Sequence, residues 1–180
     1  LILVAPDGAG PGGHRDTSMF LNRGDGRCRM EDYMVRELVP WLQQRYNATP
    51  RADCRALVGL SGGGYAAVNL ALKHPDTFRI AASHSGLFAP EDDPVYFYLW
   101  LGPRWDLWDA NRPLTQIRTS PTASRLHIYQ DVGSSDELTP ENREFAALLQ
   151  ARGVDHVLRV PPGSHRWSYR SRQSSQSLRL

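Results

Sequence analysis

The chain has 180 residues, of which 41% are hydrophobic and 22% charged, and its formal net charge is +2. This composition is typical of one globular domain with its own core, and the small net charge argues against nucleic acid or an anionic membrane surface as a partner. No apolar run reaches the roughly 18 residues of a membrane-spanning helix, so we expect no membrane insertion.

The first third of the chain predicts two strands separated by a loop and a helix. Residues 1–5 are a continuous apolar run, which favours a buried strand of a parallel sheet. Residues 7–29 are rich in Gly, Arg and Asp and predict a long loop. Residues 31–46 repeat apolar side chains every three or four positions, as on one face of a helix, and Pro40 predicts a kink within it. Residues 55–60 predict the second strand.

The rest of the chain alternates helices with strands. Residues 62–74 predict a helix that ends before Pro75, because proline disfavours helical geometry in the residue before it. The further elements are a strand at 79–83, an irregular excursion with short helices at 89–122, a strand at 126–130, a helix at 140–152, a strand at 155–160, and a short helix after His165 that leads into a Ser-, Arg- and Gln-rich tail at 168–177. This alternation predicts one α/β domain over residues 1–180, with a mostly parallel sheet covered by helices on both faces.

A serine lies among glycines where the second strand becomes a helix, in the stretch "GLSGG" at 59–63. This is the G-x-S-x-G pattern of a nucleophile, here Ser61, held on a sharp turn at the carboxyl edge of a sheet. We expect helix and strand to approach too closely for side chains at Gly59 and Gly63. The helix N-terminus, beginning with the amide of Gly62, would favour developing negative charge. The alternative is a glycine-rich turn that only packs helix against strand.

A nucleophilic serine needs a base, and the base needs an orienting acid. Asp131, Asp136 and Glu137 follow one predicted strand, and His165 follows the next. Because parallel strands end at the same edge of a sheet, all four should lie near Ser61, in the chain order serine, acid, histidine. The sequence therefore predicts a serine hydrolase site, with the identity of the acid open at this point.

Four segments resemble the esterase D family of α/β-hydrolases, which includes S-formylglutathione hydrolases, tributyrin-type carboxylesterases, feruloyl esterases and mycolyltransferases. They are "EDYMVRELVPWL", "GLSGGGYAAVNLALKHPDTFRIAASHSG", "DVGSSDEL" and "PPGSHRWSY". The resemblance implies an α/β-hydrolase fold with Ser61 as nucleophile, Asp136 as acid and His165 as base. It leaves Asp131 as the second choice for the acid and His84 as a site-wall or structural histidine.

The chain departs from this family in two ways. Gly62 stands where the family usually has methionine, although its backbone N–H would still serve the oxyanion hole. The family also carries an earlier strand with a His-Gly loop that supplies the other oxyanion donor, and nothing precedes residue 1 here. We therefore expect an N-terminally truncated domain that lacks the first strand or strands. The glycine-rich loop at 8–13 is an alternative source of amides.

Hydrolysis of an ester or thioester through an acyl-enzyme on Ser61 is the expected activity, without a metal or an organic cofactor. Acyl transfer to an alcohol or sugar by the same triad is one alternative. A catalytically impaired hydrolase domain that binds a partner is another. The expected partner is a small-molecule ester, and no nucleic acid is expected.

Aromatic residues and cysteines complete the candidates. The stretch at 95–108 is expected either to line the substrate pocket or to form a satellite core. The candidate pocket residues are Tyr98, Trp100, Trp105, Trp167 and His84. Cys28 and Cys54 fit no metal pattern and are most simply two thiols, with one bridge as the alternative.

Overall fold

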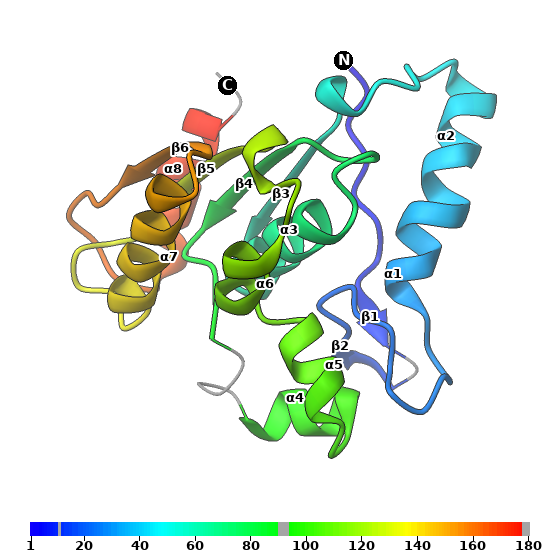
Figure 1. Cartoon of the computed structure of the whole chain (residues 1–180), viewed down its shortest axis with the longest axis horizontal. Coiled ribbons are helices and arrows are strands. Elements are labelled where there is room, and N and C mark those ends of the chain that lie inside the picture. The colour runs from blue at the N-terminus through cyan, green and yellow to red at the C-terminus, as the bar shows by residue number, and fades with distance from the viewer. Residues whose placement is uncertain (11, 90–93, 178–180) are drawn as a thin grey trace.

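A four-stranded parallel sheet forms the centre of the computed structural model, which describes residues 1–10, 12–89 and 94–177 (Figure 1). Neighbouring strands pair in the order β3–β4–β5–β6 and end level with one another. The strands are β3 (Ala56–Leu60), β4 (Ile80–His84), β5 (His127–Asp131) and β6 (Asp155–Arg159). Each lies within one residue of its predicted bounds, so these four strand predictions are confirmed.

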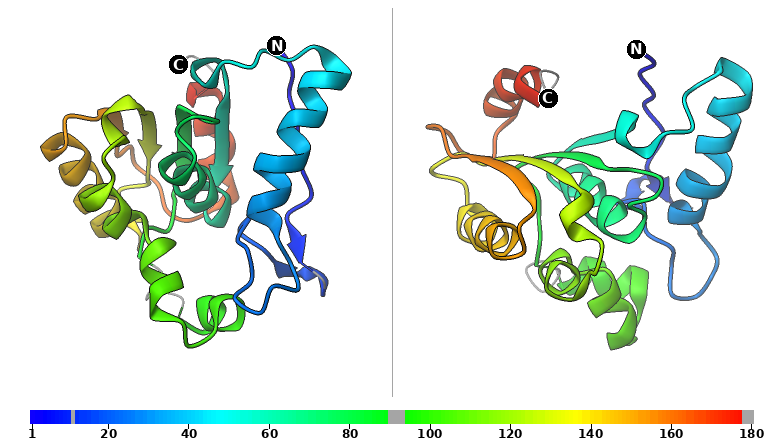
Figure 2. Two further views of the ribbon diagram at one scale, coloured as in Figure 1. Left: turned by 45° about the vertical axis from the view of Figure 1, so that its right-hand side comes forward. Right: turned by 45° about the horizontal axis from the view of Figure 1, so that its top comes forward.

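Helices lie on both faces of this sheet, as predicted for an α/β fold (Figure 2). One face carries α3 (Gly62–Lys73), α6 (Pro113–Thr119) and α7 (Thr139–Ala151), and the opposite face carries α8 (Trp167–Ser177). The Ser-, Arg- and Gln-rich segment predicted as a tail is thus helical, because it continues the helix that begins at Trp167.

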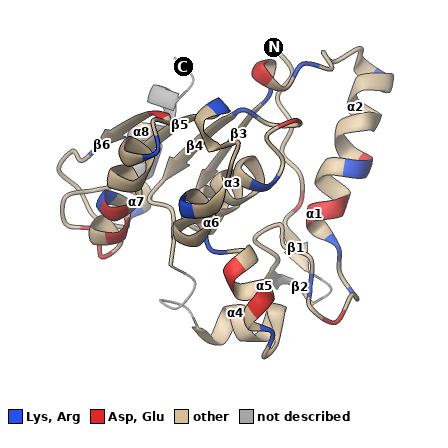
Figure 3. Ribbon diagram, in the orientation of Figure 1, with Lys and Arg blue, Asp and Glu red and all other residues tan. Residues whose placement is uncertain are grey.

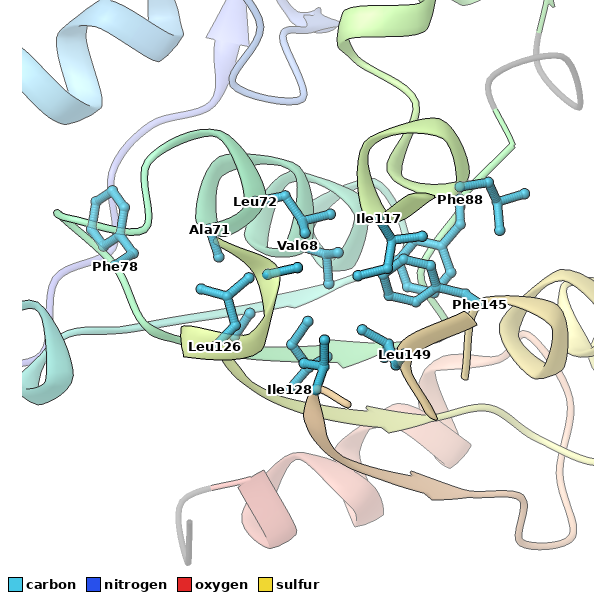
Figure 4. Close-up of a cluster of buried hydrophobic side chains, with 14 of the residues drawn as sticks. Val68, Ala71, Leu72, Phe78, Phe88, Ile117, Leu126, Ile128, Phe145 and Leu149 are labelled. Carbon is cyan, nitrogen blue, oxygen red and sulfur yellow. The ribbon is translucent and has the colours of Figure 1, made fainter. Parts of the chain in front are cut away.

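The main hydrophobic core lies between the sheet and the helices α3, α6 and α7 (Figure 4). Val68 and Leu72 of α3 point into it from one side and Ile128 of β5 from another. Phe88 and Phe145 pack with ring centroids 4.5 Å apart. Burial of such side chains contributes about 1.5–3 kcal/mol each, so this cluster holds the strands that end at the site.

A second cluster lies over the N-terminal half of α3 and contains the excursion helices α4 (Pro94–Leu101) and α5 (Trp105–Ala110). Its buried members are Leu21, Tyr65, Ala66, Leu87, Phe97, Trp100 and Leu101. The rings of Tyr65 and Phe97 meet edge to face at 5.3 Å. The prediction of short helices in this region is confirmed, and residues 90–93 lie outside the described part.

One continuous helical stretch from Met30 to Tyr46 matches the predicted helix. It consists of α1 (Met30–Asp32), the π-helical segment η1 (Tyr33–Leu38) and α2 (Val39–Tyr46). The π-helical segment ends two residues before Pro40, which lies in the first turn of α2. The stretch ends at Asn47, which adopts the left-handed conformation.

A buried acid, Glu31, ties this stretch to the end of α3. Its carboxylate accepts from the Lys73 ammonium at 2.5 Å and lies 2.7 Å from the His74 imidazole, and Lys73 also donates to Asn111 at 2.9 Å. We refer to these four residues as the Glu31 cluster. Burial alone would raise the pKa of Glu31, but the contacts with His74 and Lys73 outweigh it and lower the pKa below 4.5.

Two expectations for the N-terminal segment are wrong. Residues 1–5 form no strand, and the side chains of residues 1–4 are exposed. An apolar run becomes a strand only where another strand pairs with it, and the described residues place none beside it. The predicted loop at 7–29 contains a small antiparallel hairpin of β1 (Ala9–Gly10) and β2 (Gly13–Thr17).

The outer strands of the main sheet are β3 and β6, each of which pairs with one other strand in the described part of the chain. Val58 in β3 is 51% exposed and Val157 in β6 is 41% exposed, whereas β4 is almost wholly buried. The strand that leads to Ser61 is therefore an edge strand of the sheet that the described residues form.

Basic and acidic residues are interspersed along the ribbon, and α7 carries both kinds (Figure 3). None of the helices in the described residues combines the length and the apolar character needed to cross a bilayer.

Cys28 and Cys54 are both thiols, which confirms the simpler of the two expectations for them.

Candidate active site

Ser61 occupies the turn between β3 and α3 with a strained backbone. Its φ is 53° and its ψ is −118°, in a region that side-chain-bearing residues rarely adopt. Such a conformation costs about 1–3 kcal/mol and persists only where the surroundings enforce it. Here the Ser61 N–H donates to the His84 carbonyl at 2.8 Å, and the Ser61 carbonyl accepts from Tyr65 at 2.9 Å. The peptide groups on both sides of the Ser61 Cα are thus held by hydrogen bonds.

The glycines around Ser61 differ in what they permit. A Cβ at Gly59 would lie 2.1 Å from the backbone of Gly63, so helix and strand do meet there. At Gly63 a Cβ would meet nothing within 4 Å, so the expected crowding at this position is wrong. The second crowded glycine is Gly64, where a Cβ would lie 2.6 Å from Ser83 Oγ. Helix and strand thus meet at the Gly63 backbone, but a side chain at Gly63 would point away from the strand into open space.

Three residues from separate strand ends form one hydrogen-bonded chain. Ser61 Oγ lies 3.0 Å from His165 Nε2. His165 Nδ1 lies 3.0 Å and 3.2 Å from the two carboxylate oxygens of Asp136. Because a carboxylate only accepts, Nδ1 carries the proton and Nε2 is left to accept from the serine hydroxyl. This is the order of contacts that a serine nucleophile, its base and its orienting acid require.

The loop of the acid and the loop of the histidine are joined along their backbones. Ser134 N–H donates to Pro161 at 2.9 Å, and Ser135 N–H donates to Gly163 at 2.8 Å. A Cβ at Gly133 would lie 2.4 Å from the backbone of Gly163, which explains a glycine at that point. Asp136 and His165 are therefore held as one unit.

Burial and hydrogen-bond partners together separate the three candidate acids. The Asp136 side chain is fully buried, and its Oδ1 also accepts from the Leu138 N–H at 3.1 Å. Asp131 is fully buried too, but its carboxylate contacts His84 and Tyr169. Glu137 is exposed. The geometry thus brings Asp136 to His165 and gives Asp131 other partners.

The start of α3 offers amides to an oxyanion. The first N–H groups of a helix have no acceptor within it, and those of α3 begin at Gly62, directly after the serine. The Met19 side chain approaches this point, since a Cβ at Gly62 would lie 3.3 Å from Met19 Cγ and Cε. In the glycine-rich stretch considered as a source of amides, residues 9, 10 and 13 belong to the β1–β2 hairpin.

The candidate pocket residues lie in different surroundings. Tyr98 and Trp105 are exposed and line an open apolar hollow of about 350 Å³ between α4 and α5. Trp167 is exposed at the start of α8. Trp100 is 2% exposed inside the second cluster, and His84 has no exposed surface. Those two side chains therefore present almost no surface to a substrate in this structure.

Two residues at the site were missed by the sequence analysis. Met19 and the next residue both have positive φ, 44° and 55°, and nothing in their residue types predicts this. Tyr169 lies in the histidine segment, four residues after His165 and in the first turn of α8, and this proximity in sequence was the available signal. Among the described residues, no group of three or more His, Cys, Asp or Glu side chains is placed to hold a metal ion.

The chain is similar in sequence to known esterases and acyltransferases. The sequence model of the family described as "Putative esterase" matches residues 1–175. "Esterase MT1326" of Mycobacterium tuberculosis is 26% identical over 196 residues, covering 92% of this chain and 41% of that protein. "Diacylglycerol acyltransferase/mycolyltransferase Ag85C" of Mycobacterium leprae is 29% identical over 187 residues, covering 84% of this chain and 56% of that protein. The chain thus spans about half the length of these curated relatives.

A solved structure shows the same fold. FphF, a fluorophosphonate-binding serine hydrolase of Staphylococcus aureus, superposes with a TM-score of 0.78 and 19% identity. The match covers 90% of this chain and 66% of FphF. The expectation of an α/β-hydrolase fold is confirmed.

Proposed function

Because this chain belongs to the esterase family whose sequence model spans residues 1–175, we propose that it is a serine carboxylesterase acting on small-molecule esters or thioesters. The observation that carries the proposal is the contact of 3.0 Å between Ser61 Oγ and His165 Nε2, with Asp136 on the other ring nitrogen. The position of Ser61 at the start of α3 supports it further.

In the proposed reaction, His165 Nε2 takes the hydroxyl proton as Ser61 Oγ attacks the ester carbonyl carbon. The Gly62 amide and the N-terminus of α3 stabilise the resulting oxyanion. His165 then passes the proton to the leaving alcohol or thiol, and an acyl-enzyme remains on Ser61. Water, deprotonated by His165, attacks the acyl carbon. The bond to Ser61 Oγ then breaks, Ser61 Oγ takes the proton back from His165, and the carboxylic acid is released. Asp136 holds the imidazole in the tautomer that accepts from serine and stabilises its charged form.

The first test is hydrolysis of p-nitrophenyl acetate and butyrate by this chain and by Ser61→Ala. We expect turnover that the substitution abolishes, together with covalent labelling of Ser61 by a fluorophosphonate. Turnover that survives in Ser61→Ala would contradict the assignment of the nucleophile. Silence of the unmodified chain with both esters and the fluorophosphonate would contradict the proposed activity.

Acyl transfer is a second candidate, favoured by the similarity to Ag85C at 29% identity. The same triad would serve, with an alcohol or sugar hydroxyl replacing water in the second step. Product analysis separates the two, because a transferase forms a new ester when glycerol or a disaccharide is added, whereas an esterase releases only free acid.

A further inference from the structure

A second histidine and aspartate pair is buried beside the triad. His84 Nδ1 lies 2.5 Å from Asp131 Oδ2, and neither side chain has any exposed surface. The other oxygen, Oδ1, accepts from the Tyr169 hydroxyl at 3.0 Å. Burying a carboxylate is costly unless it is paired and hydrogen-bonded, so both partners are needed to hold Asp131 in place.

One end of this chain of contacts reaches the nucleophile. The His84 carbonyl accepts from the Ser61 N–H at 2.8 Å, and the amide of the next residue, Ser85, donates to the Asp131 carbonyl at 2.7 Å. The backbone that holds the strained Ser61 turn is thus tied to Asp131 through both the side chain and the main chain of this corner.

The other end reaches the histidine loop. A Cβ at Gly163 would lie 2.2 Å from Tyr169 Cδ2, so the tyrosine ring lies directly against this backbone two residues before His165. Gly163 in turn accepts from the Ser135 N–H next to Asp136. Burial, with the nearby Asp131 carboxylate, raises the pKa of the Tyr169 hydroxyl well above its ordinary value. The hydroxyl therefore remains protonated and remains a donor.

We propose that His84, Asp131 and Tyr169 form a positioning relay that sets the separation of Ser61 Oγ and His165 Nε2. This inference rests on the proposed function of Ser61 and His165 and assigns a role to three residues outside the triad. The relay crosses from the strand end that carries the serine to the loop that carries the histidine. A displacement of about 1 Å between such groups costs roughly 10²-fold in rate.

The test uses substitutions that keep shape and change one contact. Tyr169→Phe removes the hydroxyl and keeps the ring against Gly163. Asp131→Asn is isosteric and removes the charge. The matched control is Asp155→Asn, which alters the exposed pair of His127 and Asp155 at the other end of the sheet, with a similar Nδ1 to carboxylate distance of 2.8 Å.

Steady-state kinetics with p-nitrophenyl butyrate should separate positioning from folding. We expect kcat to fall roughly 10- to 100-fold in Tyr169→Phe and in Asp131→Asn, with KM changed less than about threefold. The double variant should lose little more than the worse single variant, since both substitutions interrupt the same relay. Asp155→Asn should retain the original kcat. Thermal unfolding confirms that each variant is folded at the assay temperature.

A proton NMR spectrum gives a readout independent of turnover. The hydrogen-bonded Nδ1 proton of His165 should shift or broaden in Tyr169→Phe and remain unchanged in Asp155→Asn. A relay variant that melts earlier but keeps both kcat and this resonance would show a purely structural role and overturn the inference. If the unmodified chain lacks Ser61-dependent turnover, the proposed function fails, and the resonance alone decides for or against positioning.

Discussion

Replacing Asp136 by asparagine tests the triad most directly. The carboxylate accepts from His165 Nδ1 with both oxygens and from the Leu138 N–H with Oδ1. An amide with its oxygen in the Oδ1 position keeps the bond from Leu138 but turns its NH₂ toward His165. In the other orientation the NH₂ group faces the Leu138 N–H, which is also a donor. Each orientation creates one clash between donors, and the fully buried side chain has no water to relieve it.

The orientation that keeps the Leu138 bond has a specific consequence for the base. Facing an NH₂ group, His165 carries its proton on Nε2 and can no longer accept from Ser61 Oγ. A wrong tautomer of this kind lowers kcat about 10⁴-fold in a serine triad, which corresponds to about 5 kcal/mol in the activation free energy. We expect kcat for p-nitrophenyl butyrate to fall 10³- to 10⁴-fold, by these same estimates, while KM changes little.

Glu137→Gln is the matched control, because it changes the neighbouring, exposed carboxylate. It should retain kcat. An Asp136→Asn variant that is folded and within tenfold of the original kcat would refute the reasoning. A greater loss of kcat in Asp131→Asn than in Asp136→Asn would also refute it, because Asp131 rather than Asp136 would then be the acid that orients His165.

Three further predictions concern stability, each measured by urea unfolding. Gly59→Ala should lower the free energy of unfolding by at least about 2 kcal/mol, since its Cβ meets rigid backbone at 2.1 Å. Gly63→Ala, whose Cβ meets nothing, should be neutral or stabilising by up to about 1 kcal/mol. Equal effects of the two substitutions would contradict the packing described. Glu31→Gln should cost about 1–3 kcal/mol at pH 7. Because the pKa of Glu31 is lowered in the folded state, the stabilisation by its carboxylate is complete above about pH 4.5 and is lost as the pH falls through the folded pKa. The difference in unfolding free energy between Glu31→Gln and the original chain should therefore shrink at pH 3. A difference that stays constant with pH would contradict this dependence on Glu31 ionisation. Gly62→Met should cost about 1–3 kcal/mol through contact with Met19, and adding Met19→Ala should recover most of it; no recovery would place the strain elsewhere.

Much of the fold and of the site could be predicted because strong local signals agreed. The glycine pattern around Ser61 lies between an apolar run and a helical period, and parallel strands oblige their ends to meet. That Asp136 rather than Asp131 contacts His165 could not be read from spacing alone. It depends on the stacking of the Gly133 and Gly163 backbones, which is a contact between distant loops.

Other features depended on tertiary context from the start. The apolar run at residues 1–5 has the residue types of a strand, but pairing requires a neighbour that the run does not encode. The positive φ of Met19 is likewise not predicted by its residue type. Tyr169 could be placed on a helix from sequence, but not against Gly163.

Among the described residues, β3 and β6 form the two edges of the main sheet, and this has a consequence for how the site is lost. Edge strands with half-exposed side chains open locally at lower free energy than buried central strands. Ser61 follows one edge strand and His165 follows the other, while Asp136 follows the buried β5. Amide protons in β3 and β6 should therefore exchange with solvent sooner than those in β4 and β5. Nucleophile and base would then separate at urea concentrations at which the core is still folded, so inactivation should precede global unfolding.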